Sequence, residues 1–109
     1  MEELGFDPAD KGQYGRNAFL SAARGGKTDI LRYLNEMNEI VDDSVKHARD
    51  KHGDTALILA AGYWSNKETV QFLIEEVGLD PADGRRNAFL CAALQGNIEA
   101  LRCLNHSLR

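Results

Sequence analysis

Internal repetition is the feature that most constrains how this chain can fold. The eight residues from Arg16 to Ala23 recur, with one difference, from Arg86 to Ala93, and a substituted copy runs from Asp54 to Ala61. A second block, Glu2 to Asp10, agrees with Glu75 to Asp83 at seven of nine positions. Two blocks that recur in the same order indicate copies of one structural unit.

Each copy has the pattern of two short helices. A residue suited to a helix N-cap comes first (Asn17, Thr55 or Asn87), and an Ala-rich apolar segment follows. After a polar or Gly break, a second segment carries apolar residues at helical spacing: Ile30, Leu31 and Leu34; Val70, Leu73 and Ile74; Ile98, Leu101 and Leu104. Helices this short are marginal alone, so the copies must bury their apolar faces by stacking. We therefore expect an all-α solenoid.

Composition limits the class of protein. The chain has 109 residues, 43% of them hydrophobic and 28% charged, which suits one globular domain. No apolar run has the length of a membrane span, and a net charge of −4 opposes nucleic acid binding. The acidic start, Met1 to Leu4, has no apolar stretch behind it, which favours an intracellular, cytoplasmic location.

The repeated pattern resembles the ankyrin repeat. The best match runs from Gly53 to Ala61 and continues through Asn66–Leu73 and Gly78–Asp80. The resemblance implies a helix–turn–helix solenoid with hairpin-like connecting turns. It divides the single domain, 1–109, into the tail of a preceding repeat and three repeats: 1–12, 13–50 with a lengthened connection, 51–82 and 83–109.

The sequence departs from the family pattern in places. The family's Pro is replaced by Ala18, Ala56 and Ala88, and its His by Leu20, Ile58 and Leu90. Because that His helps to bond the hairpins together, the resemblance implies a weaker network here. The first repeat is also longer than the family period, and the excess lies in residues 35–51. We interpret it as a lengthened second helix or an extra helical turn.

Candidate catalytic and binding motifs are weak. Residues 24–28 (RGGKT) look like the end of a phosphate-binding loop, but the Gly required five residues before Gly26 is Ser21, and the preceding segment reads as helix. The two D-P-A-D turns offer too few oxygen ligands for Ca²⁺, and Asp capping a turn before Pro explains them.

The cysteines and histidines show no site spacing either. Cys91 and Cys103 occupy structural positions within helices, and His47, His52 and His106 are scattered. We therefore expect no catalysis, no metal, no cofactor and no small-molecule substrate.

The resemblance implies that a protein partner docks on the concave face, formed by the hairpin tips and the first helix of each repeat. Carried over to this sequence, that face comprises Gln13, Tyr14, Arg16, Arg24, Lys51, His52, Asp54, Tyr63, Trp64, Asp83, Arg86, Leu94 and Gln95. Trp64 is either an anchor for the partner or a cover for the gap left by an inserted residue.

Charge on this face leaves two alternatives open. In the first, Arg16, Arg24 and Arg86 form a basic stripe that would suit an acidic peptide. In the second, the same arginines belong to a solvated mixture of charges without function. The opposite side carries acidic residues: Glu36, Glu39, Asp42 and Asp43.

The sequence thus predicts a protein-interaction module. The alternative is a structural or regulatory fragment of a larger ankyrin protein, which packs on neighbouring repeats. The sequence starts within the end of one repeat. We therefore expect the chain to be a piece of a longer array, or its first residues to be a degenerate cap. Uncapped ends could then drive self-association.

Overall fold

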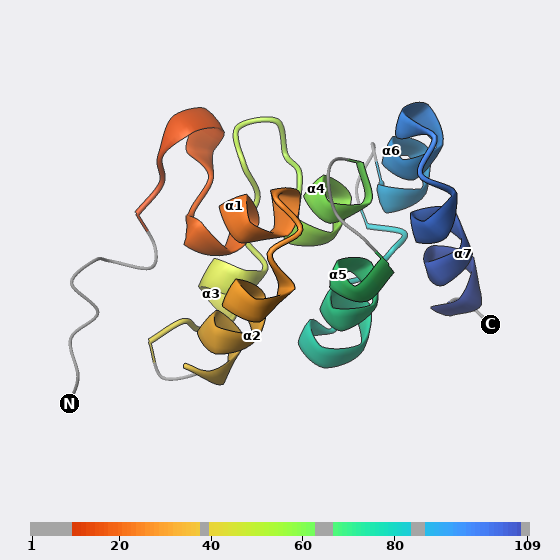
Figure 1. Ribbon diagram of the computed structural model, residues 1–109. Coiled ribbons are helices and arrows are strands. Elements are labelled where there is room, and N and C mark those ends of the chain that lie inside the picture. The colour runs from red at the N-terminus through yellow and green to blue at the C-terminus, as the bar shows by residue number, and fades with distance from the viewer. Residues whose placement is uncertain (1–9, 38–39, 63–66, 84–86, 108–109) are drawn as a thin grey trace.

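The computed structural model describes residues 10–37, 40–62, 67–83 and 87–107. Within these ranges the regular structure is helical, with no strand. Most of the helices form three pairs that stack side by side (Figure 1). The expected all-α solenoid is confirmed.

The first helices of the pairs begin at the predicted caps. These helices are α1 (Ala18–Arg24), α4 (Ala56–Gly62) and α6 (Ala88–Gln95). In each, the capping side chain accepts a hydrogen bond from the backbone N–H three residues later, at 2.9 Å for Asn17, 3.4 Å for Thr55 and 3.1 Å for Asn87. The cap therefore satisfies one of the backbone donors that a helix start leaves free.

The second helices of the pairs are α2 (Thr28–Glu36), α5 (Lys67–Phe72) and α7 (Ile98–Ser107). Helix α5 continues into a wider turn, η2 (Leu73–Val77), which ends at Gly78. Gly78 adopts the left-handed conformation, with φ of 83°, that a residue without a Cβ reaches at little cost. The predicted Gly stop is confirmed.

The helices form two layers in an elongated molecule of 41 × 24 × 20 Å. Helix α4 packs between α1 and α6 in one layer, and α5 contacts α2 and α7 in the other (Figure 1). The fully buried side chains of both layers make one continuous core: Phe19, Leu20, Leu31, Leu57, Leu59, Val70, Leu73 and Leu104. Each pair thus hides its apolar side on its neighbours, as the repetition predicted.

Small residues set how closely the first helices approach. A Cβ added to Gly62 on α4 would lie 3.1 Å from the Cβ of Cys91 on α6. The paired alanines Ala60 and Ala61 of the same helix are fully buried. A larger side chain at Gly62 would push the two helices apart.

The lengthened connection contains one extra helical turn, α3 (Asp43–Lys46). Helix α2 ends at Glu36, so the extra turn rather than a longer second helix is correct. The Asn17 side-chain amide donates to the Val45 carbonyl at 3.1 Å, and Val41 and Val45 are buried in the core. The insertion is therefore packed against the start of α1.

Candidate functional site

Two connecting loops lie side by side next to the first helices (Figure 1). The first loop is residues 10–17, which include the short turn η1 (Gln13–Gly15), and the second loop is residues 47–55. The Tyr14 carbonyl accepts a hydrogen bond from the Lys51 N–H at 2.8 Å. Gly15 has φ of 70°, and a Cβ there would lie 3.1 Å from the Lys51 nitrogen. The loops meet so closely that this position favours glycine.

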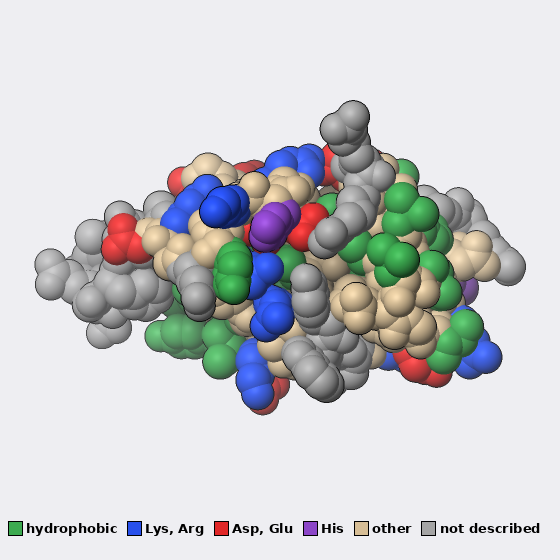
Figure 2. Space-filling view, turned by 90° about the horizontal axis from the view of Figure 1, so that it is seen from above, with side chains coloured by type: hydrophobic (Ala, Val, Ile, Leu, Met, Phe, Trp, Pro, Cys, Tyr) green, Lys and Arg blue, Asp and Glu red, His purple; other side chains and the backbone are tan. Residues whose placement is uncertain are grey.

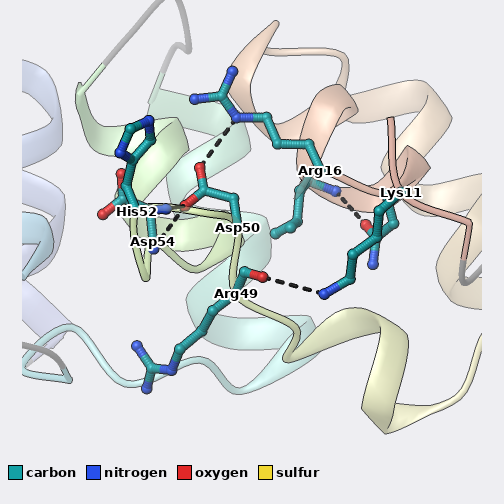
Figure 3. A network of polar contacts seen from close by, with 8 residues as sticks. Lys11, Arg16, Arg49, Asp50, His52 and Asp54 are labelled. Carbon is teal, nitrogen blue, oxygen red and sulfur yellow. Dashed lines mark hydrogen bonds and ion pairs between the residues drawn. The ribbon is translucent and has the colours of Figure 1, made fainter. Parts of the chain in front are cut away.

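A buried carboxylate holds the two loops together (Figure 3). Asp50 Oδ2 accepts a hydrogen bond from Arg16 Nε at 3.1 Å, and the Asp50 side chain is 0% exposed. Its Oδ1 accepts the backbone N–H groups of His52 at 2.9 Å and Asp54 at 3.0 Å. One side chain thus shapes the second loop and ties it to the first.

Two further cations extend this polar network. Lys11 Nζ donates to the Arg49 carbonyl at 3.4 Å. The Arg49 guanidinium donates to the Gly53 carbonyl at 3.1 Å and pairs with the Asp83 carboxylate at 2.6 Å. Asp83 belongs to the turn after η2, so the network runs from the first loop to the approach to α6.

Aromatic side chains lie over the network on its solvent side. Tyr14 is 49% exposed, and the Arg16 guanidinium carbon lies 4.9 Å from its ring centre. The His52 ring centre lies 6.2 Å from that of Tyr14. A shallow cleft of about 240 Å³ borders these groups and is lined by Gly12, Tyr14, Arg16, Ser21 and Arg24. Figure 2 shows basic side chains near the middle of this face and hydrophobic ones toward α6.

Comparison with known families decides what this arrangement is. Residues 2–85 match the family model for ankyrin repeats, in three copies. The chain belongs to the ankyrin repeat family. No curated protein matches the sequence. That the two loops and the first helices form the concave face stays a prediction, as do the repeat boundaries at residues 12, 50 and 82.

The loops of these ankyrin repeats are bonded without the family His. Leu20 and Ile58, which replace it, are 0% and 3% exposed and contribute to the apolar core. The backbone bond between Tyr14 and Lys51 and the Arg16–Asp50 pair connect the loops instead. The polar contacts described between these two hairpins lie in the loops.

The predicted interaction residues differ in exposure. The exposed ones are Tyr14, Lys51, His52, Leu94 and Gln95, and the partly buried ones are Arg16, Arg24 and Asp83. Asp54 is 2% exposed. The others, Tyr63, Trp64, Arg86 and the side chain of Gln13, lie outside the described residues. The structure brings Tyr14, Lys51 and His52 together, whereas Leu94 and Gln95 lie at the α6 end of the ankyrin domain.

The predicted charge pattern is modified by pairing. Arg16 contacts Asp50 rather than standing free in a basic stripe, and Arg86 lies outside the described residues. On the opposite side Glu36, Asp42 and Asp43 are exposed, and Glu39 is outside the described part. Hydrogen bonds from the Ser44 hydroxyl and the Val45 N–H lower the pKa of Asp42.

Sequence reasoning missed Asp50 and Arg49. The sequence does contain a signal for Asp50, because Asp at the first position of a β-turn and Gly at the fourth is a common pattern. The structure has that turn, in which the Gly53 N–H donates to the Asp50 carbonyl at 3.0 Å. That pattern predicts the turn but carries no information about Arg16, which is 34 residues away.

Residues 24–28 join α1 to α2, as the helical reading predicted. A phosphate-binding loop requires a strand before the loop. The Thr28 hydroxyl is buried and hydrogen-bonded to the Thr69 hydroxyl at 2.7 Å. A nearby open depression of about 310 Å³ is lined by Lys27 as well as by the carboxylates Asp29 and Glu68, so its charge does not favour an anion.

The remaining weak motifs have structural roles. Asp80 Oδ1 accepts the Ala82 N–H at 2.9 Å, so the second D-P-A-D segment is a capped turn, as expected. Cys91 is 5% exposed, and burial raises the pKa of the Cys103 thiol, which disfavours the reactive thiolate. In the described part of the chain, His, Cys, Asp and Glu form no group suited to a metal ion. None of the described helices is long and apolar enough to span a membrane.

Proposed function

We propose that this ankyrin repeat domain binds a protein partner on its concave face and performs no chemistry. The observation that carries the proposal is the exposed group Tyr14, Lys51 and His52, supported from below by the buried Asp50 carboxylate. Tyr and Arg are enriched among residues that dominate binding energy, and Arg16 stacks on Tyr14.

Rigidity of the loops favours binding. Asp50 fixes the backbone of the second loop at two N–H groups, and the first loop is bonded to it at Lys51. A loop that is already ordered loses less conformational entropy when a partner docks. The same contacts also set the spacing between the Tyr14 and His52 rings.

The chemistry of the face favours an acidic segment with apolar residues. Lys11 and Lys51 are exposed beside the cleft that contains Arg24, while the nearby carboxylates of Asp50 and Asp83 are paired with arginines. Apolar contact is available at Leu94 on α6. Such a face attracts acidic peptides, and salt weakens that attraction.

A displayed library of random 12-residue peptides, selected against the domain, tests the proposal. We expect selected peptides to be enriched in Asp and Glu. Their affinity should fall at least about tenfold in Lys51→Glu/His52→Ala, which removes exposed contacts without touching Asp50. Trp64→Ala, measured in parallel, tests whether Trp64 anchors the partner.

The matched control is Tyr33→Glu, because Tyr33 is 61% exposed on α2, in the layer opposite the concave face. Peptides should bind this variant as they bind the wild type. Peptides that are basic, or that bind Lys51→Glu/His52→Ala with unchanged affinity, would contradict the proposal.

We further infer that the domain works inside the cell, in the cytoplasm. The chain has two cysteines, Cys91 and Cys103, and they do not form a disulfide with each other, which suits a reducing compartment.

A second candidate function is packing on another helix pair or self-association. The observation that favours it is apolar surface on α6 and α7, where Leu90, Leu94 and Ile98 are all at least half exposed. Such association leaves Tyr14, Lys51 and His52 accessible but covers Leu94, so the two functions compete for that side chain.

A further inference from the structure

The cleft of about 240 Å³ has both of its walls in one repeat. Gly12, Tyr14 and Arg16 come from the first loop, and Ser21 and Arg24 come from α1. The polar side chains among these five residues can all donate hydrogen bonds, and none of the five is acidic. The cleft is smaller than sites that hold whole small-molecule ligands, so it suits a single side chain.

The two α1 residues of the cleft lie where nearly identical segments of the chain differ. The repeated eight-residue segments at the starts of α1 and α6 differ only at Ser21, where α6 has Cys91, and the next residue is Arg24 in one and Leu94 in the other. Exposure does not explain the second change, because Leu94 is 75% exposed and Arg24 only partly. The repeat with the cleft therefore carries hydrogen-bond donors where its copy carries apolar side chains.

The backbone of Tyr14 is strained at the rim of the cleft. Tyr14 has φ of 62° and ψ of 17°, and in the described part of the chain it is the one non-glycine residue with a positive φ. This conformation is costly for a bulky side chain, and such strain is concentrated at binding sites. The Gly12 N–H donates to the Arg16 carbonyl at 2.9 Å, which closes the turn around it. A glycine would fit this backbone better, so the presence of the ring indicates a use at the surface.

We propose that the cleft binds the carboxylate of one Asp or Glu side chain of the partner. Arg24 and the Ser21 hydroxyl donate hydrogen bonds to it, and the Tyr14 ring covers the aliphatic part of that side chain. The inference rests on the proposed function and names the subsite that recognises the acidic segment.

The charge of the cleft favours a carboxylate over a phosphate. The Asp50 carboxylate already balances the charge of Arg16, at 3.1 Å, so Arg24 leaves the lining with one net positive charge. A carboxylate side chain carries a single negative charge, whereas a phosphorylated side chain carries about two.

Nuclear magnetic resonance of the full, ¹⁵N-labelled chain tests the proposal without a selected partner. The probe is the pentapeptide acetyl-AAEAA-amide, added to about 20 mM in about 150 mM salt, because one carboxylate in a small cleft binds weakly. The amide signals of Gly12, Tyr14 and Ser21 should shift. The peptide with glutamine in place of glutamate should leave them unchanged. Tighter binding of the phosphoserine peptide would overturn the choice of a carboxylate.

Ser21→Glu should weaken binding of the glutamate peptide at least about tenfold, because it puts the domain's own carboxylate in the cleft. The substitution is compatible with folding, because Ser21 is exposed and glutamate favours helix. Tyr33→Glu is the matched control, since it adds the same charge at an exposed position on α2. It should bind like the wild type. Equal loss in both variants, shifts confined to other residues, or no shift at the highest concentration would each overturn the proposal.

Tyr14→Gly separates the role of the ring from that of the loop. It should unfold at a temperature no lower than the wild type, because glycine relieves the strain, while binding of the glutamate peptide weakens at least about threefold. Tyr14→Phe should bind like the wild type. A melting temperature lowered by more than about 4 °C in Tyr14→Gly would overturn the role of the ring in binding.

The two proposals fail separately. If the library yields acidic peptides that bind Ser21→Glu as tightly as the wild type, the subsite is wrong and the proposed function stands. If the glutamate peptide shifts the cleft signals but the library yields no acidic peptides, the subsite stands and the proposed function is wrong.

Discussion

At the scale of single residues, Asp50 connects folding to the candidate site. Its carboxylate is fully buried and serves Arg16 and two backbone N–H groups. The Arg49–Asp83 pair in the same network is 44% exposed at both side chains. Loss of one member of an ion pair costs more stability when the pair is buried. The remaining charge of an exposed pair is solvated by water, whereas that of a buried pair is left without compensation.

Asp50→Asn should destabilise the domain by about 2–4 kcal/mol, because the guanidinium of Arg16, whose side chain is only 11% exposed, loses its counter-charge. Asp83→Asn, the matched control, should cost less than about 1 kcal/mol. Urea unfolding followed by circular dichroism measures both. Equal effects of the two substitutions would refute a structural role for the buried pair. Arg16→Met combined with Asp50→Asn should cost less than the sum of the single changes.

At the scale of elements, identical helix starts have different neighbours. Asn17 and Asn87 cap α1 and α6 with the same side-chain oxygen. Asn17 also donates its amide to the Val45 carbonyl of α3 at 3.1 Å. The extra turn inserted in the first repeat is thus attached through a capping residue that the repeats share.

Asn17→Ser should therefore cost about 1–2 kcal/mol, while Asn87→Ser should be nearly neutral. Serine caps a helix about as well as asparagine, so the difference reports the Val45 hydrogen bond. Thermal unfolding of the two variants provides the comparison. If both lose the same stability, the amide bond to α3 contributes nothing.

At the scale of the whole molecule, stability depends on position in the stack. Helix α4 packs on α1 and on α6, whereas α7 contacts α5 and α6 at one end. Leu59 on α4 and Leu104 on α7 are both fully buried. In a solenoid, a central pair supports two neighbours and an end pair only one.

Leu59→Ala should lower the stability of the entire domain by about 2–5 kcal/mol. Leu104→Ala removes the same side chain but should loosen mainly α6 and α7. Native-state hydrogen exchange distinguishes them: amides of α1 and α2 should lose protection in the first variant and keep it in the second. Uniform loss in both would mean that the domain unfolds as a single unit.

Much of the fold followed from the sequence alone, because its signals are local. Asn17, Thr55 and Asn87 marked the helix starts, Gly78 marked a stop, and the recurrence of Ala-rich segments predicted stacking. These features depend on residues close together in the chain, where backbone geometry and capping decide the outcome.

Tertiary structure decided which of the repeated residues are available. Leu20 and Leu90 occupy the same place in almost identical segments, yet one is buried and the other half exposed. Arg16 looked like a free cation until folding brought Asp50 beside it. Burial and pairing depend on what lies nearby in space, and a repeated local pattern contains no record of which neighbour each copy will meet.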